Sequence, residues 1–402
     1  MKRLALALAL GACEPARAPE LAFTAAEVVF QLPGVTPRSV YVTEAPGGRL
    51  FAWVTATGSG GTAVWRSERV GGGWSAPLPL PRPPTTTEEE VLWSTSAPAA
   101  MVLTRGTGPS GVGLFVREHG GNVRNGVTND WLGPQVVVPT GAEAPSRVGF
   151  AATRMPVARG RPPVHLVYAI PGGGCEDGYT LRHRGSAEPG AWSAFSTVAV
   201  VCGLESLALA AADGADGPLV AAWTARPPGG GERRVATATA PLSAPGQWSG
   251  WQFLVSSAVG EPEVVRLAAL GGGAVLASWL PSLRPRRAAF GLRSTGQGFA
   301  FGATWFLTGA APWIEPFGGE ALAFGTESEA PAARLVVRRF EGASRSVASL
   351  SPVRAPLGEA DNHRLLVTQD GAVHAFWIEA QAGLRRVLAA SARSPSRDAG
   401  RD

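Results

Sequence analysis

The sequence predicts an all-β fold, a seven-bladed β-propeller whose blades are four-stranded antiparallel sheets. Short apolar runs separated by glycine-rich turns recur about every 45–60 residues, which is typical of a propeller blade. An aromatic landmark closes the second run of most units. It is found at Trp53, Tyr168, Trp223, Trp279, Phe324 and Trp377. The period persists without a linker break, which disfavours the alternative of two β-sandwich domains.

Composition agrees with many short strands joined by tight turns. The 402 residues include 52 Gly and 34 Pro, and hydrophobic residues make up 45%. Charged residues reach only 17%. The formal net charge is +5, and Lys2 is the single lysine. Such preference for arginine is better explained by genomic composition than by an anionic partner, so no nucleic-acid partner is predicted.

The N-terminus resembles a bacterial lipoprotein signal. Lys2 and Arg3 precede an apolar stretch, and Leu10-Gly11-Ala12-Cys13 resembles a lipobox. We expect a signal peptide over 1–12, lipidation of Cys13 and a tether over 13–25. No apolar run long enough to cross a bilayer follows. These features predict a lipid-anchored protein of the bacterial cell envelope, periplasmic or surface-exposed; the alternative is an ordinary signal peptide with an incidental cysteine.

The repeat divides residues 26–392 into units of strands A to D. We expect strand A at 39–45, 147–153, 206–212, 263–270 and 363–369, and strand C at 62–68, 113–118, 179–184, 233–240 and 385–392. Strand B carries the aromatic landmark, and strand D follows a Trp-Ser turn. Units start near Arg38, Glu90, Arg147, Glu205, Glu263, Glu315 and Asp361.

The last unit ends after strand C, so we expect the lone segment 27–32 to complete it as an outer strand. That pairing would close the ring and leave only short, protected edges. Residues 393–402 are polar and are expected to fray. Six blades with one irregular unit remain the alternative.

The two remaining cysteines predict one disulfide. Cys175 precedes strand C of the third unit and Cys202 ends its strand D. Since neighbouring strands are antiparallel, both sulfurs belong at the same edge of one blade, and an exported protein would oxidise them. Two separate buried thiols are the alternative.

Ser67 to Trp74 is similar to the Asp-box of sialidase-type propellers, Ser-x-Asp-x-Gly-x-x-Trp, with Arg69 in the place of the Asp. In that family the Asp-box is a structural turn away from the active site, so the resemblance implies fold rather than catalysis. A sialidase would also need an arginine triad, a Tyr–Glu pair and an Asp acid/base. Tyr41 and Tyr168 lie inside predicted strands, and no such pair or triad can be assigned.

Charged residues at the starts of strand A are the candidate ligand-binding residues. If the units register as proposed, these residues would ring the mouth of the central channel: Arg38, Glu90, Arg147, Glu205, Glu263, Glu315, Asp361 and His363. The alternative is that strand starts simply meet water. The histidines show no metal-ligand spacing, and no cofactor is predicted.

The sequence favours a monomeric, non-catalytic binding or scaffold module for an envelope glycan or protein ligand, touching the membrane through its lipid alone. The alternative is a sialidase-like glycoside hydrolase or lyase that uses the channel mouth. A purely structural envelope protein is the third hypothesis.

Overall fold

The computed structural model is all-β, and no α-helix occurs in the residues that it describes. The described part of the chain accordingly contains no helix that is long and apolar enough to cross a membrane. The described residues are 21–45, 48–79, 90–96, 99–108, 111–118, 135–138, 147–152, 164–186, 192–212, 217–227, 229–254, 261–270, 273–281, 287–293, 299–306, 313–317, 320–329, 332–340, 347–349, 363–381 and 383–393. The expected signal peptide, Cys13, Asp361 and the tail after 393 lie outside them.

In this part of the chain the strands form seven antiparallel sheets. The first three contain β2 (Thr36–Ala45), β3 (Arg49–Gly58), β4 (Gly61–Val70) and β5 (Gly73–Trp74), with β6 (Leu78–Pro79) also on β4; β7 (Glu90–Ser96), β8 (Ala99–Gly108), β9 (Gly111–Glu118) and β10 (Gln135–Val138); and β11 (Arg147–Ala152), β12 (Val164–Pro171), β13 (Gly178–Ser186) and β14 (Ser196–Cys202).

The other four sheets repeat the same order. They contain β15 (Leu207–Ala211), β16 (Pro218–Ala225), β17 (Arg234–Pro241) and β18 (Gln252–Phe253); β19 (Pro262–Ala269), β20 (Val275–Pro281), β21 (Arg287–Arg293) and β22 (Phe299–Phe306); β23 (Trp313–Phe317), β24 (Glu320–Glu329), β25 (Ala332–Phe340) and β26 (Val347–Ser349); and β27 (His363–Val367), β28 (Ala372–Gln381), β29 (Leu384–Arg393) and β1 (Glu27–Phe30).

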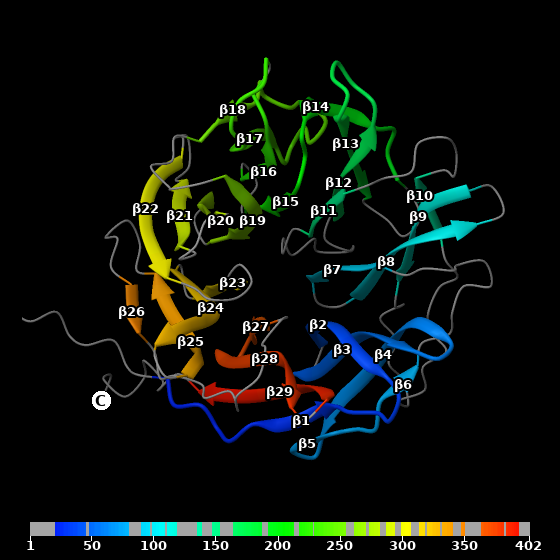
Figure 1. Cartoon of the computed structure of the whole chain (residues 1–402), viewed down its shortest axis with the longest axis vertical. Coiled ribbons are helices and arrows are strands. Elements are labelled where there is room, and N and C mark those ends of the chain that lie inside the picture. The colour runs from blue at the N-terminus through cyan, green and yellow to red at the C-terminus, as the bar shows by residue number, and fades with distance from the viewer. Residues whose placement is uncertain are drawn as a thin grey trace, which may run out of the picture.

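The sheets surround a common centre, with the first strand of each sheet innermost (Figure 1). Each of these inner strands contacts the inner strand of the next sheet, and β27 of the last sheet contacts β2 of the first. The inner strands are β2, β7, β11, β15, β19, β23 and β27. Side chains on neighbouring inner strands can therefore meet near the centre although they are far apart in sequence.

The aromatic landmarks fill the spaces between sheets. The side chains of Trp53, Trp223, Trp279 and Trp377 are almost fully buried. Apolar clusters join successive sheets, and Trp223 packs with residues of the third and fourth sheets. Each buried aromatic of this size removes about 150–250 Å² from water. The landmarks in described segments are thus core residues.

The two ends of the chain meet in the last sheet. β1 pairs antiparallel with β29, with Glu27 opposite Ala389 and Phe30 opposite Val387. Leu21 is buried against the same sheet, and the Thr24 amide donates to the Ser391 carbonyl at 2.8 Å. The folded part therefore begins by Leu21, inside the segment expected to be a tether.

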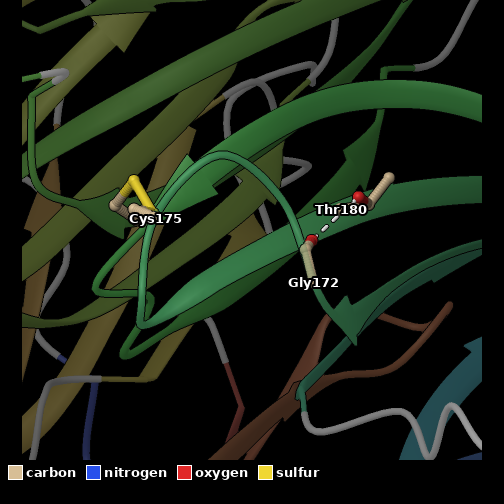
Figure 2. Close-up of a disulfide and its surroundings, with 4 residues drawn as sticks. Gly172, Cys175 and Thr180 are labelled. Carbon is tan, nitrogen blue, oxygen red and sulfur yellow. Dashed lines mark hydrogen bonds between the residues drawn. A yellow bond between two sulfur atoms is a disulfide. The ribbon is translucent and has the colours of Figure 1, made fainter.

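The predicted disulfide is confirmed. Cys175 and Cys202 are bonded, with their Cα atoms 6.2 Å apart, at the end of the third sheet where β13 begins and β14 ends. The turn before β13 is held by the Thr180 hydroxyl, which donates to the Gly172 carbonyl at 3.1 Å (Figure 2). Gly173 has a φ of 137°, so this turn favours glycine. In the chain-entropy model a closed loop of this length stabilises the fold by about 3 kcal/mol.

Candidate functional site

Four side chains from four consecutive inner strands meet near the centre of the ring. We call them the axial cluster: Tyr41 on β2, Arg266 on β19, Trp313 on β23 and Arg364 on β27. Because β19, β23, β27 and β2 are neighbours in that order, the cluster forms an arc between the fifth, sixth, seventh and first sheets.

The Arg364 guanidinium packs on two aromatic rings. Its Cζ lies 4.3 Å from the centre of the Trp313 ring and 4.7 Å from that of Tyr41. Nη1 donates to the His363 carbonyl at 2.9 Å, and the residue is only 7% exposed. Contact with ring faces holds a cation in place without neutralising its charge.

Arg266 is the second cation of the cluster. Its Cζ lies 5.1 Å from the centre of the Trp313 ring. The pKa of Arg266 is lowered to about 9, mainly by burial and also by the charge of Arg364, while Tyr41 opposes the shift. The side chain still keeps part of its surface open to solvent. The site therefore disfavours the positive charge that Arg266 carries at neutral pH.

No carboxylate of the described residues forms an ion pair with Arg266 or Arg364. The Nε atoms of both are buried and have no hydrogen-bond partner among these residues. A buried charge without an opposite charge costs several kcal/mol. An anionic group bound between these strands would remove much of that cost.

Trp313 is fixed in turn by the next sheet. Its indole Nε1 donates to the Leu365 carbonyl of β27 at 3.1 Å. The ring thus connects β23 to β27 and offers an aromatic surface to both guanidiniums. Aromatic rings beside hydrogen-bond donors are suited to a ligand that has both apolar and polar faces.

The predicted channel-mouth residues have mixed surroundings. Arg38 is exposed, and its Nε donates to Thr57 at 3.4 Å; Glu205 pairs with Arg233 at 3.3 Å. Glu263 is half-buried, whereas Glu315 and His363 are buried, the latter with its ring against Phe324.

The other three predicted mouth residues cannot be compared in this way. Glu90 and Arg147 begin β7 and β11, but their side chains are outside the described part, as is all of Asp361. A binding ring made of these eight residues stays a prediction.

Sequence reasoning did not identify the axial cluster, although three of its four residues lie close in sequence to predicted mouth residues. Tyr41, Arg266 and Arg364 each lie three residues after a predicted mouth residue: Arg38, Glu263 and Asp361 respectively. A recognisable signal was present, because an arginine inside an apolar inner strand, as in Glu263 to Leu270, has no simple structural explanation. The sequence predicts that Tyr41 lies within a strand. It does, but the strand is an inner one.

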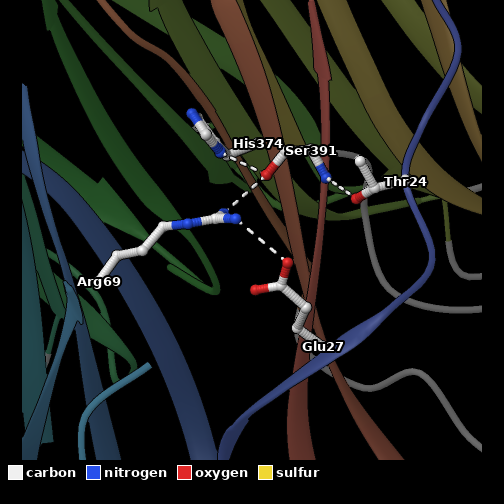
Figure 3. A network of polar contacts seen from close by, with 5 residues as sticks. All are labelled: Thr24, Glu27, Arg69, His374 and Ser391. Carbon is white, nitrogen blue, oxygen red and sulfur yellow. Dashed lines mark hydrogen bonds and ion pairs between the residues drawn. The ribbon is translucent and has the colours of Figure 1, made fainter. Parts of the chain in front are cut away.

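A second polar network joins the first sheet to the last, and Figure 3 shows it. Arg69 donates through Nη2 to Glu27 at 3.1 Å and through Nη1 to the Ser391 hydroxyl at 3.0 Å. Ser391 lies 2.8 Å from His374 Nδ1, and its amide donates to Thr24 at 3.1 Å. We call these five residues the closure network. Arg69, which replaces the Asp of the Asp-box pattern, thus links the first sheet to the last.

A pair of buried histidines lies between the third and fourth sheets. His165 Nδ1 and His183 Nε2 are 3.2 Å apart, and the His183 ring packs on Trp248. Burial lowers the pKa of His165 to about 4 and that of His183 to about 3, the latter also because of His165. Within the described residues no group of three His, Cys, Asp or Glu side chains could hold a metal ion.

No protein-family model matches the chain, and no curated protein resembles it in sequence. Solved structures do resemble it in fold. A polysaccharide lyase, Uly1, matches with a TM-score of 0.55 at 11% identity, covering 90% of each chain. A protein of unknown function from Dyadobacter fermentans matches with a TM-score of 0.53 at 9% identity, covering 94% of this chain and all of the other. The NanB sialidase of Streptococcus pneumoniae has a TM-score of 0.46 at 11% identity, covering 91% of this chain and 70% of that one.

The likeness to the polysaccharide lyase supports a β-propeller fold for the present chain. At such low identity the likeness concerns the fold alone.

Proposed function

We propose that the axial cluster binds an acidic group of a saccharide. One observation carries the proposal: Arg266 and Arg364 are packed on Trp313 with no carboxylate among the described residues to pair with them. Guanidinium groups suit carboxylate, sulfate and phosphate oxygens because they donate several hydrogen bonds in one plane.

The choice of a saccharide has two supports. Trp313 and Tyr41 give the cluster aromatic surface, on which sugar rings can stack while their hydroxyls bond elsewhere. The fold neighbour with a TM-score of 0.55 is a polysaccharide lyase. The fold alone does not fix a substrate, so the chemistry of the cluster decides the ligand class.

The test compares an acidic with a neutral oligosaccharide of the same length. Glucuronic-acid-containing oligosaccharides should bind in calorimetry, and their neutral counterparts should bind at least about tenfold more weakly, a difference of about 1.4 kcal/mol. Arg266→Met should remove this preference. Arg49→Met is the matched control, because Arg49 is paired with Glu68 in the first sheet. Equal binding of acidic and neutral chains would overturn the proposal.

Turnover is the second candidate function, and the position of Tyr41 favours it. A phenol that contacts Arg364 and lies near Arg266 could supply or accept a proton beside a bound carboxylate, as a glycoside hydrolase or lyase requires. Tyr41→Phe should then abolish product formation from an acidic polysaccharide and leave its binding within about threefold. Product formation that is unchanged in Tyr41→Phe would exclude this role.

We further propose that the seven sheets are the blades of one ring closed by β1, and that the protein is a monomer carried on the bacterial envelope by a lipid on Cys13. The pairing of β1 with β29 supports the first part, and the lipobox-like segment supports the second. Cys13→Ala should move the protein from the membrane to the soluble fraction. Unchanged fractionation would refute the anchor without affecting the binding proposal.

A further inference from the structure

Trp313 stands where a carboxylate would be expected. Two guanidiniums packed on the same side chain inside a fold normally share an acidic residue, because the ion pair repays part of the cost of burial. Here both cations face one indole ring, at 5.1 Å and 4.3 Å. The ring attracts them through its π-electrons and leaves both charges in place.

The orientation of the Trp313 ring is set by contacts outside the axial cluster rather than by the two arginines. The indole N–H is committed to the Leu365 carbonyl at 3.1 Å, and Trp313 packs with the apolar cluster between the sixth and seventh sheets. Arg364 contacts a second ring, Tyr41, so two aromatic contacts determine its position. Arg266 has only Trp313 among the described rings, so it depends on Trp313 more strongly.

We infer that Trp313 is the positioning residue of the axial cluster: it holds the guanidiniums of Arg266 and Arg364 by stacking, in place of an acidic residue, so that both positive charges remain for the ligand. The benefit of keeping both charges rests on the proposed binding of an acidic saccharide, whereas the stacking of the guanidiniums on Trp313 does not. This role of Trp313 predicts that stability and binding respond in opposite directions when a carboxylate is introduced.

Two substitutions of nearly equal size test this. Trp313→Gln and Trp313→Glu both remove the ring, and they differ mainly in one negative charge. In the ligand-free protein Trp313→Glu should unfold at a temperature about 2 °C or more above that of Trp313→Gln, because the carboxylate neutralises the cations. For the acidic oligosaccharide the order should reverse, with Trp313→Glu binding at least about tenfold more weakly than Trp313→Gln.

Trp313→Phe serves as the conservative variant. It keeps an aromatic face but loses the bond to Leu365, so its affinity for the acidic oligosaccharide should stay within about threefold to fivefold of the wild type. Trp313→Gln should bind about tenfold more weakly than the wild type at low salt. Rescue by Phe and not by Gln separates stacking from a role in filling space.

The outcomes separate the inference from the proposed function. If the wild-type protein binds no acidic oligosaccharide, the proposed function fails, yet the stability order of the Glu and Gln variants still tests the position of Trp313. If the wild type binds and both variants lose affinity and stability in parallel, Trp313 is a core residue only and the inference is wrong. If neither of these variants folds, equal affinity of Trp313→Phe and Trp313→Leu would likewise overturn it.

Discussion

Arginine side chains lie in two regions of the protein, one in which the positive charge is paired with a carboxylate and one in which no described carboxylate pairs with it. In the closure network Arg69 has Glu27 and the Ser391 hydroxyl as partners, and it stays partly exposed. In the axial cluster Arg364 is only 7% exposed and contacts two aromatic rings and a backbone carbonyl. The first arrangement is satisfied within the protein, whereas the second leaves charge available.

The difference indicates which arginines serve the fold and which serve a ligand. A paired arginine contributes modestly to stability, and its loss leaves an acid unpartnered. An unpaired buried arginine lowers stability, so its presence needs another reason. The closure network thus explains a departure from the Asp-box pattern, and the axial cluster marks the site where binding is expected.

The strongest way to test this comparison is to remove Arg364, the more buried cation of the axial cluster. Arg364→Met should weaken binding of the acidic oligosaccharide at least about a hundredfold, or about 2.7 kcal/mol, because the main charge contact is lost. The same variant should be as stable as the wild type or more stable by about 1 kcal/mol, since methionine fills similar space without charge. Calorimetry and urea unfolding measure the two effects. A clear loss of stability would show that Arg364 is structural.

The next largest effect is expected at acid pH, where protonation of His374 in the closure network should lower the stability of the fold. Burial lowers the pKa of His374 to about 4, Arg69 contributes in the same direction, and Asp370 opposes it. The unfolded chain, with an ordinary histidine pKa of about 6.5, binds the proton more tightly, so stability is lost as pH falls from about 6.5 toward 4. Between about pH 7.5 and pH 5 this residue should cost the fold about 2 kcal/mol.

His374→Gln isolates that loss. The substitution keeps a polar group near Ser391 but does not titrate, so its urea-unfolding free energy should fall by about 2 kcal/mol less than that of the wild type over the same pH range. His165 and His183 lower stability at acid pH in both proteins and cancel in the difference. Identical pH dependence of the two proteins would contradict a neutral His374 in the closure network.

Arg69→Met should give a smaller effect of the opposite kind from Arg364→Met. It removes bonds to Glu27 and Ser391 at the joint between the first and last sheets, and should lower the unfolding free energy by about 1–2 kcal/mol. Affinity for the acidic oligosaccharide should be unchanged. If Arg69→Met impaired binding as much as Arg364→Met, the division between the two regions would be wrong.

The smallest effect is expected at the predicted channel mouth. Glu205 pairs with Arg233, but 46% of its side chain is exposed, so solvent screens the pair. Glu205→Gln should change stability by less than about 0.5 kcal/mol and affinity by less than about twofold. A large loss of affinity in this variant would restore the predicted channel mouth as the site and weaken the case for the axial cluster.

Much of the fold could be predicted from the sequence because the repeat is local. Alternating apolar residues and glycine turns define each strand, and the buried aromatic landmark recurs with them, as at Trp223 and Trp377. The Cys175–Cys202 bond followed from antiparallel neighbours, and the segment from Glu27 was expected beside the last unit. These inferences need only the pairing of adjacent strands.

The candidate site depends on alignment between sheets, which the sequence does not encode locally. Trp313 is the first residue of β23, whereas Arg364 is the second residue of β27 and Arg266 is the fifth residue of β19. One fixed offset from the start of each unit therefore cannot find all three. Only the packing of β19, β23 and β27 side by side brings these residues together.

The pairing of β1 with β29 has a consequence for the order in which the protein can fold. β1 is synthesised before the strands of the other six sheets and β29 after them, so those six sheets must be made before the seventh sheet is complete. Contacts between such distant segments form slowly, and until then the edge of β29's sheet and the apolar face of β1 stay open to other chains. Moving residues 21–32 to follow Arg393 would make that sheet contiguous in sequence, and the relocated strand should close the ring without waiting for the far end of the chain.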